Sequence, residues 1–121
     1  MASKIKKGII DFLSNIKTKI YPYNAISEAE VVKNLQDLSK ASTYENLERG
    51  FNRTLNELYE YDKLEKWYYD EDKKSLVKYD DETQIGLKKP KFWRIAGDVI
   101  IEPPEKIYRR YIIKSKIYCN N

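Results

Sequence analysis

The residues most able to do chemistry in this sequence are basic and aromatic side chains in its last third. Residues 88–121 carry nine Lys or Arg and three Asp or Glu, a net charge of +6. Cationic side chains attract phosphates and release counterions, and flat aromatic rings can stack on bases, so such a cluster is one footprint of nucleic-acid binding. The candidate contacts are Lys88, Lys89, Lys91, Trp93, Arg94, Arg109, Arg110, Lys114 and Lys116.

The distribution of charge along the chain leaves a second interpretation open. Residues 1–26 carry five Lys and one Asp, whereas residues 27–87 carry nine Lys or Arg and fifteen Asp or Glu. Two basic ends therefore flank an acidic middle with a net charge of −6. Basic ends packed beside the acidic middle would neutralise it within the fold. A functional basic patch and this internal neutralisation both remain open at the level of sequence.

Catalytic and metal-binding chemistry finds little support in the residue inventory. The sequence contains no histidine, which removes the commonest general base and any zinc site of the Cys/His type. The acidic runs at residues 70–72 and 80–82 lack the fixed spacing and the glycine of a cation-binding loop. Neither G-x-x-x-x-G-K nor G-x-G-x-x-G occurs. We therefore expect a non-enzymatic protein that uses no metal, no cofactor and no small-molecule substrate.

Cysteine usage and hydropathy bear on the compartment. The one cysteine, Cys119, lies two residues from the end of the sequence and has no intrachain partner, which fits a reducing environment. No stretch approaches the roughly 20 apolar residues that span a bilayer, and the basic N-terminus lacks the apolar run of a secretory signal. We expect a cytoplasmic protein without a membrane partner.

An amphipathic basic helix is predicted over residues 4–20. Its apolar residues recur at spacings of three and four, and lysines occupy much of the remaining surface. Such a helix can lie on an anionic membrane surface or in the groove of a partner. A domain this small needs the apolar face for its own core, so we expect the helix to pack inside the domain. That face consists of Ile5, Ile9, Phe12, Leu13, Ile16 and Ile20.

Two further helices follow. The first, about residues 27–40, begins at an S-x-x-E capping box that starts at Ser27. The second, residues 43–61, has apolar residues at helical spacing. Ser42 and Thr43 are expected to cap it, and Ser42 starts a second capping box. Gly50 lies inside this helix, where it costs up to about 1 kcal/mol relative to Ala, and we expect it to allow the close approach of a neighbour.

The second half of the chain changes to β-type patterns. Residues 65–79 predict a β-hairpin with a charged turn, and residues 91–101 predict a strand bent at Gly97. Residues 105–118 fit a strand or a helix equally, and this stays open. We therefore expect one α+β domain over residues 1–121, with three N-terminal helices followed by a β-hairpin and a basic, aromatic, β-rich C-terminal segment.

Residues 26–79 resemble the winged-helix family of DNA-binding domains, because a helix-turn-helix over residues 26–61 precedes the wing-like hairpin WYYDEDKKSLVKY. The resemblance implies that the second helix enters the DNA major groove while the wing contacts the backbone. Arg and Asn suit this role, since they make bidentate contacts with guanine and adenine. The same helix departs from the expected charge, with four Glu against two Arg. By position, the groove would receive Thr43, Glu45, Asn46, Arg49, Asn52 and Arg53, and the wing would offer Lys73 and Lys74 to phosphates.

These observations lead to two hypotheses of different kinds. The first is a non-enzymatic nucleic-acid-binding protein, such as a small winged-helix-like transcriptional regulator. The alternative is a protein-interaction or structural assembly component without nucleic-acid binding, for example a viral or phage accessory or inhibitor protein. The Tyr, Trp and Arg content suits interface hot spots, and the separated charge suits a homo-oligomer or a charged protein partner.

Overall fold

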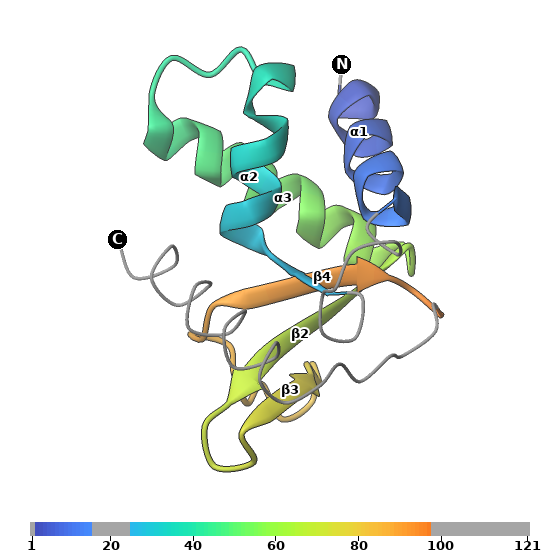
Figure 1. The fold of residues 1–121 in the computed structure, drawn as a ribbon, viewed down its shortest axis with the longest axis vertical. Helices are drawn as coiled ribbons and strands as arrows, with labels where there is room; N and C mark the ends of the chain where they lie inside the picture. The colour runs from blue at the N-terminus through green and yellow to red at the C-terminus, as the bar shows by residue number, and fades with distance from the viewer. Residues whose placement is uncertain (1, 16–24, 98–121) are drawn as a thin grey trace.

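The structure, a computed structural model, describes residues 2–15 and 25–97 and combines helices with an antiparallel sheet (Figure 1). This confirms the expected mixed α+β class. The predictions for residues 98–101 and 105–118, and those for Arg109 and Arg110, fall outside the described residues. The helices are α1 (Ala2–Asn15), α2 (Glu28–Leu35), the short 3₁₀ helix η3 (Gln36–Leu38) and α3 (Tyr44–Glu60). The strands are β1 (Ile26–Ser27), β2 (Leu64–Asp70), β3 (Ser75–Lys78) and β4 (Lys91–Ile95).

The strands pair in the order β1-β4-β2-β3, and each neighbouring pair is antiparallel. β2 and β3 form a hairpin in which Asp70 lies opposite Ser75. β4 pairs with the other edge of β2 and also takes β1, with Ile26 opposite Trp93. The sequence did not predict β1, because two residues are too few to show an alternating pattern. β4 is consequently an interior strand with a neighbour on each side.

The helix starts follow local capping chemistry. The Ser27 hydroxyl accepts a hydrogen bond from the Glu30 backbone N–H at 3.3 Å, which is half of the predicted capping box. Before α3 the cap is Thr43, which accepts from the Asn46 N–H at 3.2 Å. Of the two residues predicted to cap this helix, Thr43 is the cap, and the capping box predicted from Ser42 was wrong by one residue. The first helix of the pair also ends earlier than expected, because the chain tightens into η3 after Leu35.

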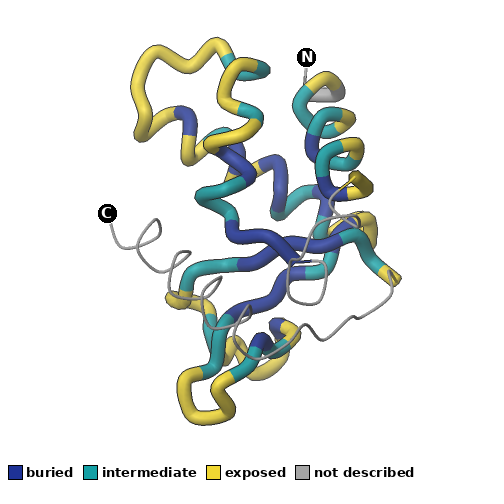
Figure 2. Tube along the Cα trace, in the orientation of Figure 1, coloured by how far each residue is buried: buried dark blue, intermediate teal, exposed yellow. Residues whose placement is uncertain are grey.

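Two apolar clusters join the helices to the sheet, and Figure 2 shows the buried chain concentrated where they meet. The larger cluster packs Ile9 of α1 and Phe51 of α3 against Trp93 of β4. The smaller cluster holds Phe92, and consecutive strand residues point to opposite faces of a sheet, so β4 is buried on both faces. Because Ile9 and Leu13 are 0% and 1% exposed, the described part of the apolar face of the N-terminal helix packs into the core, as expected. The prediction for residues 16–20 falls outside the described residues.

Candidate functional site

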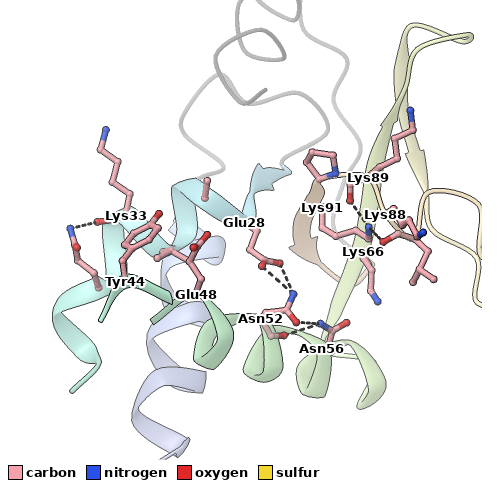
Figure 3. Close-up of a pocket in the computed structure, with 15 residues that line it drawn as sticks. Glu28, Lys33, Tyr44, Glu48, Asn52, Asn56, Lys66, Lys88, Lys89 and Lys91 are labelled. Carbon is pink, nitrogen blue, oxygen red and sulfur yellow. Dashed lines mark hydrogen bonds between the residues drawn. The ribbon is translucent and has the colours of Figure 1, made fainter. Parts of the chain in front are cut away.

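A groove of about 850 Å³ lies between the α2–α3 pair and the segment that leads into β4 (Figure 3). This volume is in the range of pockets that hold small ligands. Among the lining residues, cations outnumber anions by five to two, so the groove favours a negatively charged occupant. The cations are Lys33, Lys66, Lys88, Lys89 and Lys91, and the anions are Glu28 and Glu48. Amide side chains of Gln36, Asn52 and Asn56 add hydrogen-bonding groups.

Glu28 lines the groove and hydrogen-bonds to a core residue, Trp93. Its Oε1 accepts from the Trp93 indole Nε1 at 3.0 Å, and its Oε2 accepts from Asn52 Nδ2 at 3.1 Å. Burial raises the pKa of Glu28 above its ordinary value, although these two hydrogen bonds and Lys91 act in the opposite direction. Asn56 Nδ2 in turn donates to Asn52 Oδ1 at 3.3 Å. The carboxylate is therefore engaged inside the protein, and a short row of amides follows α3 away from it (Figure 3).

Lys91 shapes the segment that carries the exposed lysines. Its ammonium group donates to the carbonyl oxygens of Gly86 at 2.6 Å and Leu87 at 2.8 Å, and also to that of Lys89. Three carbonyls thus converge on one cation, which holds the chain in a compact bend. Lys88 and Lys89 project from this bend and are exposed to solvent. Lys91 was predicted as a direct contact, and the structure gives its ammonium group these intramolecular partners instead.

The bend also depends on Gly86, and this gives a test of how the groove wall is built. Gly86 has φ +88°, and a Cβ there would lie 2.6 Å from the Tyr68 ring. We expect Gly86→Ala to lower the free energy of unfolding by about 2–4 kcal/mol, from the steric overlap and the left-handed backbone. Urea denaturation followed by circular dichroism measures the change.

Gly50→Ala is the matched control for this substitution. A Cβ at Gly50 would meet nothing within 4 Å, so the expectation that this glycine permits close packing was wrong. Because Gly50 lies inside α3, Gly50→Ala is expected to stabilise the protein by about 0.5–1 kcal/mol. Equal effects of the two substitutions would contradict the packing described for Gly86.

Lys66 is a buried cation that the sequence analysis missed. It is 8% exposed, and its ammonium nitrogen lies 4.4 Å from the Tyr59 ring centroid and 4.7 Å from that of Tyr79. Burial lowers the pKa of Lys66, and burial together with Lys66 lowers the pKa of Lys91 to about 8. The available signal was alternation along β2, which places Lys66 on the same face as Leu64. These two lysines make the floor of the groove positive, and their ammonium groups have intramolecular partners: aromatic rings around Lys66 and carbonyl oxygens around Lys91.

Two of the predicted contacts, Trp93 and Arg94, lie in the interior. Trp93 is 0% exposed and belongs to the main core, so it does not offer a stacking surface. Arg94 is 1% exposed, and its Nη1 lies 3.3 Å from Glu65 Oε1. Burial alone would raise the pKa of Glu65, but hydrogen bonds from Gly97 N–H and the Trp67 indole, with Arg94 and Lys78, outweigh it and lower that pKa. Their interior positions are a correction to the expected surface cluster, and the physical reason is that β4 is buried on both faces.

The residues predicted from the winged-helix resemblance are spread over a wider surface. Of these, the groove includes Asn52, whereas Arg49 and Arg53 are exposed on α3 outside its lining. Arg49 Nη2 lies 2.6 Å from Glu45 Oε1, and such an exposed pair contributes little and exchanges partners easily. Lys73 and Lys74 are exposed at the turn of the β2–β3 hairpin, also outside the groove lining. Of the predicted contacts, the structure therefore places Asn52, Lys88, Lys89 and Lys91 in the lining of one groove.

Comparison with known proteins does not indicate a function for the groove. No protein-family model, no curated protein and no solved structure matches the chain. Within the described residues, no group of three or more His, Cys, Asp or Glu side chains is placed to hold a metal ion. In the same part of the chain, no helix has both the length and the apolar character needed to cross a membrane. The function must therefore be argued from the groove.

Proposed function

We propose that this protein binds nucleic acid without catalysing a reaction, and that its groove holds the phosphate backbone. The observation that carries this proposal is the excess of lysine over glutamate in the groove lining. Lys33 on one wall and Lys88 and Lys89 on the other are exposed, so their charges can reach phosphates without any change in the fold. Neutralising phosphates in this way releases counterions and drives association.

The order of the elements supports a winged-helix-like arrangement within this proposal. A first helix, a helix pair and then a hairpin follow one another along the described chain. In such an arrangement the β2–β3 hairpin would act as the wing, and the groove wall that α3 forms would face the nucleic acid. Lys73 and Lys74 at its turn would then provide secondary phosphate contacts, and a small regulator of transcription is the role that fits best.

The direct test is binding of the full chain to labelled DNA, as a random duplex and as a single strand, at increasing salt. Three phosphate contacts predict that the logarithm of the association constant falls with the logarithm of salt concentration with a slope of about −2 to −3. Absence of binding to both forms at about 50 mM salt would contradict the proposal.

The pH dependence of binding gives a separate prediction through Lys91. Because its pKa is lowered to about 8 by burial and by Lys66, Lys91 loses its charge as pH rises from 7 to 9. We expect affinity to fall roughly threefold, through the loss of one cation from the groove. Lys91→Arg keeps the charge at these pH values and should remove the pH dependence, as measured by fluorescence anisotropy.

The contribution of Lys91 to protein stability should change in the opposite direction, between about pH 8 and its ordinary pKa of 10.5. The pKa of Lys91 in the folded state lies below its ordinary value of 10.5, so the folded protein binds fewer protons than the unfolded chain between about pH 8 and 10.5. The contribution of Lys91 to stability therefore rises with pH. A loss of affinity accompanied by unfolding would contradict this assignment.

A protein partner is the second candidate function, and one observation favours it. Ile85 and Leu87 are 60% and 53% exposed on the segment before β4, where Leu87 also lines the groove, and exposed apolar side chains that lie close together can mark an interface. Sedimentation velocity at increasing protein concentration tests association between copies of this chain. Reversible dimerisation that Leu87→Ser abolishes would favour this candidate over nucleic-acid binding.

A further inference from the structure

We infer that the groove takes a single strand of nucleic acid rather than a duplex, with one base stacked on Tyr44. This inference rests on the proposed function and specifies the form of nucleic acid that the groove recognises. It comes from three independent features, which are the charge of α3, the shape of the groove and the exposure of Tyr44.

The charge of α3 opposes its insertion into duplex DNA. The helix carries four Glu against two Arg, a net charge of −2. One of those arginines, Arg49, already lies beside a glutamate, at 2.6 Å from Glu45. The major groove is about 12 Å wide and is walled by two phosphate chains, so an inserted helix would bring its carboxylates close to phosphates on both sides. Groove insertion of α3 is therefore electrostatically unfavourable.

The lysine groove, in contrast, is concave and has exposed lysines on both walls. Lys33 projects from α2, whereas Lys88 and Lys89 project from the segment before β4 (Figure 3). A volume of about 850 Å³ matches the pockets that take small ligands, so part of one strand can enter the groove, whereas a duplex could only lie across its mouth. A single sugar–phosphate chain lying in the groove can be contacted from both walls.

Tyr44 supplies the aromatic surface that single-strand binding requires. It is the first residue of α3, lines the groove and is 60% exposed, next to Lys33 and Glu48 (Figure 3). Proteins that bind single strands combine a basic groove with aromatic rings on which bases stack, because every base has a flat face. Asn52 and Asn56 lie farther along α3 in the same groove, where Asn52 hydrogen-bonds to Glu28 and Asn56 donates to Asn52.

The test compares two fluorescein-labelled probes of the same sequence content, an oligonucleotide of about 12 nucleotides and a duplex hairpin. Fluorescence anisotropy with the full chain at one salt concentration is expected to show the single strand bound about tenfold more tightly than the duplex. Tyr44→Ala should lower single-strand affinity about tenfold, whereas Tyr44→Phe retains the ring and should stay within about twofold. Tyr61→Ala is the matched control, since Tyr61 is 69% exposed and does not line the groove.

The outcomes separate this inference from the function on which it rests. If the duplex binds as tightly as the single strand, or if Tyr44→Ala leaves the affinity unchanged, the single-strand inference is overturned and nucleic-acid binding stands. If neither probe binds, both the inference and the proposed function fail. If poly-glutamate displaces the single strand at a lower concentration than unlabelled oligonucleotide does, the occupant is an acidic polypeptide, and the inference is overturned.

Discussion

Trp93→Ala is expected to lower the free energy of unfolding by about 3–5 kcal/mol, because it empties the centre of the main core. Trp93 is 0% exposed, packs with residues of α1 and α3, and donates its indole N–H to Glu28. The substitution therefore also removes one hydrogen bond from the half-buried Glu28 carboxylate. Since small domains are stable by about 5–15 kcal/mol, a large part of the population should unfold on mild heating or in low urea. Urea denaturation monitored by far-UV circular dichroism measures the loss.

One variant separates the packing of Trp93 from its hydrogen bond, and a second is a control for loss of an exposed ring. Trp93→Phe keeps a buried ring but loses the indole N–H and should cost clearly less, about 1–2 kcal/mol. Tyr61→Ala changes an exposed aromatic residue and should stay within about 0.5 kcal/mol of the parent. If Trp93→Ala left stability unchanged and reduced binding alone, the side chain would be a surface contact and the interior position of β4 would be wrong.

Reversal of two charges on the groove wall should have the largest effect on binding. Lys88→Glu combined with Lys89→Glu converts two exposed cations of the groove into anions. We expect affinity for nucleic acid to fall by about 2–3 kcal/mol, or roughly 100-fold, with a shallower dependence on salt because two phosphate contacts are lost. Stability should remain close to that of the parent protein, since both side chains are exposed. Anisotropy titrations at two salt concentrations provide the measurement.

Lys4→Glu combined with Lys7→Glu is the matched control for this reversal. Both lysines are exposed on α1 and lie outside the groove lining, so the variant has the same net charge without altering the groove. It should lose affinity only a few-fold through the long-range field. A similar loss in the two double variants would show that total charge, and not the groove, governs binding.

Removing an anion from the same groove should act in the opposite direction. Glu48 is exposed and lines the groove beside Tyr44 and Lys33 (Figure 3). Glu48→Gln is expected to raise affinity roughly threefold by removing repulsion from phosphates, whereas Glu60→Gln, exposed on α3 outside the groove, should change it less. Unchanged affinity in Glu48→Gln, measured by the same titration, would contradict an anionic occupant of the groove.

The sequence predicted those parts of the fold that depend on local chemistry. Ser27 marks the start of α2 because its hydroxyl can satisfy a free backbone N–H, and this depends only on residues three positions away. The helix α3 and the β2–β3 hairpin could be predicted for the same reason, since helical and strand periodicities are local properties of the sequence. The mixed α+β class followed from the change in period.

The groove and the interior position of β4 could not be predicted from the sequence, because both depend on contacts between distant parts of the chain. Trp93 and Arg94 looked like surface contacts in a basic segment, but β4 inserts between β1 and β2 and buries them. The groove forms only when the helix pair packs beside the segment leading into β4, which brings Lys33, Asn52 and Lys88 into one lining. Of the predicted contacts, Lys88 and Lys89 fit the proposed interface directly, because both are exposed in a surface turn that lines the groove.

The most direct test of the claim that this groove binds nucleic acid is an NMR titration of the full chain, uniformly labelled with ¹⁵N, against an unlabelled oligonucleotide. Backbone amide shifts should change most at Lys33, Tyr44, Asn52, Lys88 and Lys89, with smaller changes on α1. That pattern would place the ligand between the two lysine walls. Shifts concentrated at Lys73 and Lys74 of the hairpin turn, or confined to α1, with the groove signals unmoved, would contradict the account.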